Sequence, residues 1–372
     1  MRTIKDSILG GYHMMKSFKI ALAYIGVIVG AGFASGQEIL QYFTSYGIIG
    51  TAGTMVSIIL FAISGKLLVQ TGCIMKANSH KEVIYKIGGN CLGKMLDIIM
   101  TFTLFCVGVV MIAGAGANLK QQFGFPIIVG STLMALLIVI VSMMNTDRVI
   151  STIGYITPFL IMFIVITCLY SINTIDQTFN QLQEVALIQP KNFSNWFISA
   201  MNYVSFNTAL GAPMALVIGG AQKYEKMASA GGLLGGMIVG ILIFLSHLAM
   251  FGKIIYIAGY DMPLLELVSS ISTKLGFVMA IILFGMICNT AIGMFYAFSA
   301  RFAKQGSRKF KKILCVFVLI AYLLSFVGFT DLVSILYPLI GYLGFVFIFV
   351  LVRWWFRERY GKNVIKSRIN DC

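Results

Sequence analysis

Long runs of apolar residues, separated by short polar connections, extend over nearly the whole chain. A membrane-spanning helix needs about 20 consecutive, mostly apolar residues, and ten stretches have this character. The pattern predicts an all-α membrane protein with about ten transmembrane helices in a single membrane domain, residues 1–372. The stretches are residues 17–44, 47–74, 93–118, 125–146, 149–172, 195–221, 227–257, 274–301, 311–329 and 332–355.

Three longer connections separate these stretches. Residues 75–92 form a basic connection that we predict to be a loop on the inner side of the membrane. Residues 173–194 form the longest connection predicted on the outer side. Within residues 259–273, Pro263 precedes a mixture of leucines and polar residues. Because proline is favoured in the first turn of a helix, this segment predicts a short interfacial helix that begins at Pro263.

The first apolar stretch contains an unusual segment, "VGAGFASGQEIL", at residues 29–40. Gly30, Gly32 and Gly36 are followed by the ionisable Glu38. Glycine weakens a helix, and non-helical backbone at membrane depth is tolerated only where it is buried in protein or lines a cavity. The segment therefore predicts a broken helix that lines a binding site.

A second break is predicted in the sixth stretch, at "NTALGAP", residues 207–213. Pro213 cannot donate the helical hydrogen bond and disfavours a helical conformation at Ala212. The two breaks fall in the first and the sixth of the ten stretches, so each lies in the first stretch of a group of five. Breaks at corresponding positions of two halves are typical of secondary transporters with inverted repeats and a midplane site. The predicted repeats are residues 17–172 and 195–355, followed by a tail, 356–372. The alternative is two ordinary kinks, since glycine and proline are common in membrane helices.

Composition and charge agree with a membrane protein. Hydrophobic residues make up 59% of the chain and charged residues 11%, against about 25% charged in soluble domains. The net charge is +15, and its placement follows the positive-inside rule for an even number of spans with both termini cytoplasmic. We therefore expect a multi-pass protein of the cell membrane, with no nucleic-acid partner. The Lys residues outside the predicted cytoplasmic segments are Lys120, Lys191, Lys253 and Lys274.

The chemistry-bearing residues do not indicate an enzyme. The seven cysteines contain no CxxC pair, and the three histidines are scattered, which argues against a zinc site. The chain has no G-x-x-x-x-G-K-[ST] loop for nucleotide phosphates. No catalytic residue is predicted, and ATP is not expected to drive the protein.

The segment "GVIVGAGFASGQE", residues 26–38, resembles the first helix of the amino acid–polyamine–organocation superfamily, which has the LeuT fold. The whole stretch more closely resembles the YkvI-like permeases, and ten spans in a five-plus-five arrangement agree with this resemblance over nearly the entire chain. The resemblance implies that the backbone amides of Gly30–Gly32 receive an anionic group and that carbonyls near Val29 and residues 206–211 receive an ammonium group. Aromatic side chains would form walls or gates, although core packing is an open alternative for them. The predicted substrate site is Gly30, Ala31, Gly32, Phe33, Ser35, Glu38, Tyr203, Phe206, Asn207, Thr208 and Gly211.

Glu38 has two interpretations, which can coexist. The sequence Ser35-Gly36-Gln37-Glu38 fits S-x-x-E, a capping box that would start the second half of the helix. Alternatively, an intramembrane carboxyl group faces a cavity and meets a cation or a proton. His247, within "IFLSHLAMF", is likewise either hydrogen-bonded within the bundle or part of a proton relay.

A coupling ion is also predicted, and its identity stays open. Sodium would be held by the carbonyl groups of Gly26 and Val29, with Asn289 and Thr290 opposite. By resemblance to sodium-coupled relatives, a hydroxyl side chain is expected where this chain has Cys288. Residues 149–173 contain no lysine that would replace sodium, whereas a proton would be carried by Glu38. No other metal or cofactor is expected.

Together these features predict a secondary active transporter, a symporter of a small amino-acid-like or related zwitterionic or cationic solute. The alternative is a ligand-sensing receptor subunit on the same fold, similar to germinant receptors. The predicted partners are a small-molecule substrate and the lipid bilayer. A monomer and a homodimer both stay open.

Overall fold

The computed structural model describes residues 2–143 and 156–370, with side chains for 14–143 and 158–358. The predicted end of the fourth apolar stretch, 144–146, and the beginning of the fifth, 149–155, lie outside the described residues. The described helices are α1 (Arg2–Ile28), α2 (Ala31–Ser35), α3 (Gln37–Tyr42), η1 (Thr44–Tyr46), α4 (Ile49–Met75), α5 (His80–Phe123), α6 (Ile127–Met143), α8 (Ile156–Asn173), α9 (Phe179–Leu187), α10 (Trp196–Gly220), α11 (Glu225–Gly252), α12 (Ile254–Ile257), α13 (Pro263–Ile271), α14 (Thr273–Ala300), α15 (Arg308–Ser325) and α16 (Phe329–Asn370).

The described residues of every apolar stretch are mainly helical and contain no strand, so the prediction of an all-α membrane protein is confirmed. Within the described residues, α4, α5, α11, α14 and the segment Phe329–Glu358 of α16 are each long and apolar enough to cross a membrane. The apolar helices α6 and α8 are shorter over their described residues. The count of ten spans stays a prediction.

The predicted loop at residues 75–92 is largely wrong, because α5 begins at His80. Ser79 starts the helix, and its Oγ accepts a hydrogen bond from the backbone N–H of Glu82 at 3.4 Å. Gly89 then interrupts the helical conformation with φ +65°, a backbone conformation that glycine adopts without steric cost. A short basic helix therefore precedes the long apolar part of α5.

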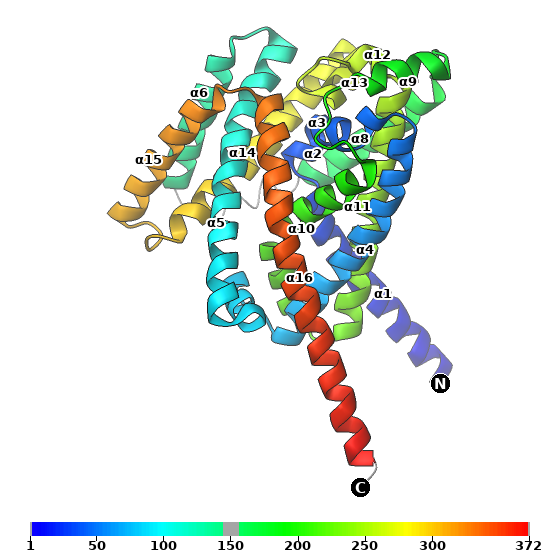
Figure 1. Cartoon of the computed structure of the whole chain (residues 1–372), viewed down its shortest axis with the longest axis vertical. Coiled ribbons are helices and arrows are strands. Elements are labelled where there is room, and N and C mark those ends of the chain that lie inside the picture. Colours follow the sequence, from blue (N-terminus) through cyan, green and yellow to red (C-terminus); the bar gives the residue numbers. More distant parts are fainter. Residues whose placement is uncertain (1, 144–155, 371–372) are drawn as a thin grey trace.

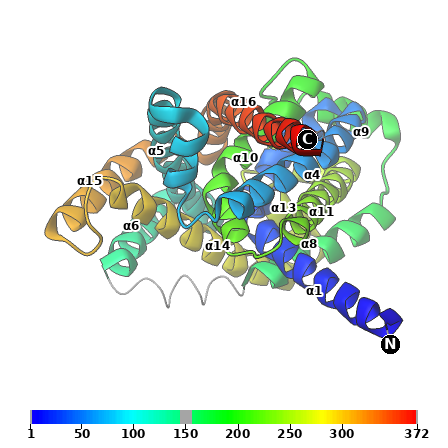
Figure 2. The same ribbon diagram turned by 90° about the horizontal axis from the view of Figure 1, so that it is seen from below.

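The helices form two groups that lie side by side. In one group, α4 packs against α10 and α11, and α1 packs against α11. In the other, α5, α6, α14 and α15 pack against one another. Figures 1 and 2 both show α15, α6 and α5 on one side and α1, α4 and α11 on the other. Helix α16 contacts both α10 and α5, so it joins the two groups.

Glycines of α11 bring its backbone close to two neighbours. A Cβ atom at Gly231 or Gly235 would lie within 3.0 Å of atoms of α1. A Cβ atom at Gly236 or Gly240 would lie within 2.5 Å of the backbone of α4. The GxxxG spacing of this segment therefore serves helix packing.

The predicted break in the sixth stretch is not observed, because α10 is one continuous helix despite Pro213. Proline removes only one backbone donor, and neighbouring helices can hold the rest of a membrane helix in place. Two side chains of α10 bond the backbone of α16: the amide of Asn202 donates to the carbonyl of Pro338 at 3.1 Å, and the hydroxyl of Ser205 donates to that of Gly341 at 2.7 Å.

One end of the molecule carries α9, α12 and α13, and both termini lie toward the opposite end (Figure 1). As predicted, α13 begins at Pro263, and its leucines are buried. This helix touches the first apolar segment at Gly36, where a Cβ atom would lie 2.7 Å from the side chain and 2.8 Å from the backbone nitrogen of Leu264.

A polar cluster at the end of α14 ties that helix to α5. Arg301 forms an ion pair with Asp97, and its other terminal nitrogen, Nη2, lies 2.8 Å from Nε2 of His80. Burial, and then the positive charge of Arg301, lower the pKa of His80. The neutral ring can therefore accept the hydrogen bond from Arg301.

Candidate substrate site

The first apolar segment is interrupted twice. Helix α1 ends at Ile28, α2 is a single turn from Ala31 to Ser35, and Gly36 separates it from α3. Gly36 has φ +82°, a left-handed conformation that is unfavourable for residues with a side chain. The glycine-rich sequence therefore creates a stretch of non-helical backbone within an otherwise helical segment.

A cavity of about 240 Å³ lies against this interruption. Its walls come from α1, α2, α3, α5, α10, α14 and α16, so it lies where the two helix groups meet. The volume is below the range of about 300–1,000 Å³ that is usual for ligand pockets, which favours a small solute. The cavity is lined by Gly26, Val27, Ile28, Gly30, Ala31, Gly32, Phe33, Glu38, Val107, Met111, Asn207, Leu210, Met214, Met286, Asn289, Thr290, Gly293, Met294 and Tyr337.

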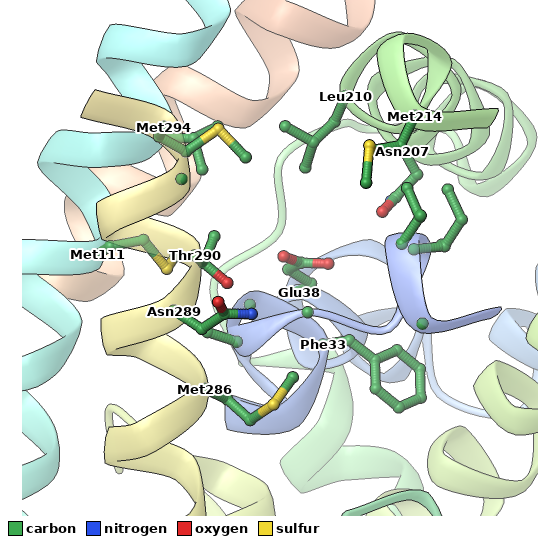
Figure 3. A pocket seen from close by; sticks show the side chains of 18 of the residues that line it. Phe33, Glu38, Met111, Asn207, Leu210, Met214, Met286, Asn289, Thr290 and Met294 are labelled. Carbon is green, nitrogen blue, oxygen red and sulfur yellow. The ribbon is translucent and has the colours of Figure 1, made fainter. Parts of the chain in front are cut away.

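Glu38 supplies the carboxyl group of the cavity. Its carboxyl lies in the middle of Figure 3, between side chains of α14 and α10. Oε2 accepts a hydrogen bond from the hydroxyl of Tyr203 at 3.1 Å. Oε1 lies beside Gly32, where a Cβ atom would be only 1.8 Å away. The absence of a side chain at residue 32 therefore makes room for the carboxyl group.

The predicted capping box is not formed. The Oγ of Ser35 accepts a hydrogen bond from the N–H of Gln37 at 3.2 Å and donates one to the carbonyl of Gly32 at 2.7 Å. Glu38 instead points toward the cavity and Tyr203. The left-handed Gly36 places Ser35 outside α3, so Ser35 cannot close a reciprocal pair with Glu38. Of the two interpretations of Glu38, the geometry agrees with the cavity-facing carboxyl.

The predicted ion ligands lie in the same cavity, with one exception. Gly26, Asn289 and Thr290 line it, whereas Val29 is buried and does not. A Cβ atom at Gly30 would lie 4.0 Å from the hydroxyl of Thr290. The interruption of the first segment therefore faces the middle of α14.

Several predicted substrate residues do not line the cavity: Ser35, Tyr203, Phe206, Thr208 and Gly211. Tyr203 donates a hydrogen bond to the lining residue Glu38, and Phe206 stacks on the lining residue Tyr337 at a centroid distance of 4.3 Å. Gly211 faces α1, since a Cβ atom there would lie 2.5 Å from Ile28. The hydroxyl of Thr208 is buried, with no hydrogen bond among the described residues. Four of these residues belong to α10, and because that helix is continuous, the unwound backbone predicted there does not line the cavity.

The sequence-based prediction missed most of the apolar wall. Helix α5 contributes Met111, α14 contributes Met286 and Met294, α10 contributes Met214, and α16 contributes Tyr337. The chain has 21 methionines in a largely apolar sequence, so none of the four is distinguished by its neighbours. Tyr337, a polar side chain directly before Pro338 in an apolar run, is the residue that the sequence offered as a signal.

His247 lies outside the cavity, fully buried in the bundle. Its Nδ1 lies 3.2 Å from the hydroxyl of Thr44, and its Nε2 lies 3.0 Å from that of Thr51. Both ring nitrogens are thus hydrogen-bonded within the bundle, as the first of the two interpretations predicted.

No family model matches the chain. Two proteins of Bacillus subtilis (strain 168) are similar to it over most of their length. The uncharacterized membrane protein YkvI is 28% identical over 334 residues, 90% of this chain and 94% of YkvI. The uncharacterized protein YyaD is 25% identical over 335 residues, 90% of this chain and 95% of YyaD. The chain is homologous to YkvI and YyaD.

Solved structures similar to this YkvI homologue are LeuT-fold transporters. MhsT in complex with L-phenylalanine has a TM-score of 0.60 and 14% identity, over 82% of this chain and 78% of MhsT. A Na⁺-coupled sialic acid symporter has a TM-score of 0.53 and 14% identity, over 90% of this chain and 78% of the symporter. A manganese transporter of Eremococcus coleocola has a TM-score of 0.53 and 14% identity, over 85% and 70% of the two chains. This homologue of YkvI therefore has the LeuT fold, and its structural neighbours are secondary transporters.

Proposed function

We propose that the chain is a secondary active transporter, a symporter that carries a small amino-acid-like or related zwitterionic or cationic solute across the cell membrane. The observation that carries the proposal is the cavity at the interrupted first segment, with the Glu38 carboxyl inside it. Placing a carboxyl group within a membrane is energetically costly, and such groups mark substrate, ion or proton pathways. The two helix groups that meet at the cavity, each built from parts of both predicted repeats, 17–172 and 195–355, would move relative to each other around this site.

Counterflow in proteoliposomes tests the proposal. Vesicles loaded with an unlabelled mixture of L-leucine, L-phenylalanine, isopentylamine and phenethylamine receive one labelled member at a time outside. A transporter should accumulate the label of its substrate transiently, whereas a sensing receptor binds without flux. If the protein binds at least one of the four compounds but none of the four shows counterflow, the result would favour the receptor and contradict the proposal. Protein-free vesicles correct for passive amine entry.

Sodium is the coupling ion that we propose. Oxygen ligands from Asn289 and Thr290, and from backbone freed by the interruption at Gly26–Gly30, would hold it. We expect uptake to fall at least about tenfold when choline replaces sodium at fixed pH, a change of roughly 1.4 kcal/mol. Thr290→Ala and Asn289→Ala should raise the sodium concentration needed for half-maximal uptake. Full uptake in choline that a proton ionophore abolishes would assign the coupling to protons instead.

The proposed orientation places both termini and residues 302–312 in the cytoplasm, with residues 173–194 and 259–273 outside. The basic residues of the chain support it. Single cysteines at Ser79, Thr178 and Ser307, in a cysteine-depleted protein, report the two sides. An impermeant thiol reagent should label position 178 in whole cells and spare 79 and 307. The reverse labelling would invert the orientation.

A further inference from the structure

The Glu38 carboxyl lies inside the cavity, directly against the interrupted segment. Its Oε1 lies against Gly32, and Oε2 is held by Tyr203. No hydrogen bond to Oε1 comes from the described part of the chain. The protein thus places one carboxyl group inside a small cavity, with Oε2 bonded to Tyr203 and Oε1 able to accept a hydrogen bond from a ligand.

The cavity offers little to a second carboxylate. Among the lining residues that the structure describes, none is Lys, Arg or His. Helix α2 is a single turn, and because the helix dipole is a sum over aligned peptide units, one turn supplies little positive potential. A ligand carboxylate would lie beside Glu38, and a like charge in a desolvated site disfavours binding.

The rest of the cavity suits an apolar body. The thioether side chains of Met111, Met286 and Met294 face it from two helices, with Met214 and Leu210 on the α10 side (Figure 3). Methionine is flexible and polarisable, so it adapts to ligands of different shape. The polar side chain of Asn207 is uncharged, and its carbonyl oxygen would orient an ammonium group rather than balance an acid.

We propose that the site takes a small monoamine cation with an apolar body and no carboxyl group. Glu38 holds the ammonium group as an ion pair, Tyr203 fixes the carboxyl, and the methionines cover the apolar body. The protein's own carboxyl thereby takes the place of the anionic group of the substrate that the resemblance implied at Gly30–Gly32. This inference rests on the proposed function, since it names the substrate class of the same site.

Matched pairs that differ only in the carboxyl group provide the test. Isopentylamine is L-leucine without its carboxyl, and phenethylamine is L-phenylalanine without its carboxyl. With purified full-length protein, we expect each amine to bind at least about tenfold more tightly than its amino acid, measured by isothermal titration calorimetry and by thermal stabilisation. Equal or tighter binding of the amino acids overturns the proposal, and so does stabilisation by sodium with none by either amine.

Variants separate the role of the charge from a general effect on the fold. Glu38→Gln should lose at least about tenfold in amine affinity, and Glu38→Ala should reverse the preference toward the amino acid because it removes the carboxyl and opens its space. Glu266→Gln neutralises a carboxyl on α13, outside the cavity, and should bind like the wild type. Unchanged amine affinity in Glu38→Gln overturns the proposal. Amine binding without counterflow would contradict only the proposed function, and counterflow of amino acids alone would contradict only this inference.

Discussion

Gly32→Ala should reduce uptake at least about tenfold, or roughly 1.4 kcal/mol, while the protein is still inserted in the membrane at a normal level. The added Cβ atom would lie 1.8 Å from Oε1 of Glu38 and 3.3 Å from the hydroxyl of Tyr337. The carboxyl group is the end of a flexible side chain, so it moves away and the helices keep their places. The readouts are uptake in proteoliposomes and the amount of folded protein by size-exclusion chromatography.

Gly293→Ala is the matched control for this change. It adds the same methyl group to the same cavity, but a Cβ atom there would meet no atom within 4 Å. We expect a much smaller loss of uptake than in Gly32→Ala. Gly211→Leu is a packing variant, because a Cβ atom at residue 211 meets Ile28 of α1, and it should lower the melting temperature as well as uptake. Equal losses in Gly32→Ala and Gly293→Ala would show that only cavity volume matters.

Glu38→Gln should reduce uptake by about a hundredfold or more and flatten its pH dependence. Glutamine has the same shape but carries no charge, and removing one partner of a buried charge pair commonly costs about 2–5 kcal/mol. Uptake from pH 5 to pH 9, at a fixed sodium concentration, measures both effects. A Glu38→Gln protein with wild-type uptake and an unaltered pH profile would leave the carboxyl without a transport role.

Tyr203→Phe tests how the carboxyl is positioned. The variant keeps the ring, which packs edge-on against Phe43 and Phe61, and removes only the hydroxyl that bonds Oε2 of Glu38. A hydrogen bond to a charged group contributes about 1.5–3 kcal/mol, so uptake should fall less than in Glu38→Gln. In the double variant the second change should add little, because both act on the same carboxyl.

The sequence predicted the helices well because their signal is local. Apolar runs of sufficient length, Pro263 at the start of α13 and the glycines at residues 30–36 each determine the backbone around them. The interruption at Gly36 follows from a single left-handed residue. Such features depend on neighbours a few positions away, which a sequence shows directly.

The site was less predictable because it is formed by contacts between distant helices. Pro213 indicated a break in α10, but the helix is continuous. It packs against α4, α1 and α16, and these contacts cannot be seen from the sequence around Pro213. The direction of the Glu38 side chain depends on Tyr203, 165 positions away, and on the missing side chain of Gly32. The four methionines that line the cavity lie on three helices, α5, α10 and α14. Their sequence surroundings do not differ from those of the other apolar residues in the chain.

The contact between Gly36 and Leu264 has a mechanical consequence. Since the two backbones meet where the first has no side chain, α3 cannot tilt toward α13 without pushing it, and the left-handed joint at Gly36 is the point about which such a tilt would turn. A solute that shifts Glu38, two residues from Gly36, would thus displace α13. The contact therefore links the cavity directly to the end of the molecule that carries α9, α12 and α13.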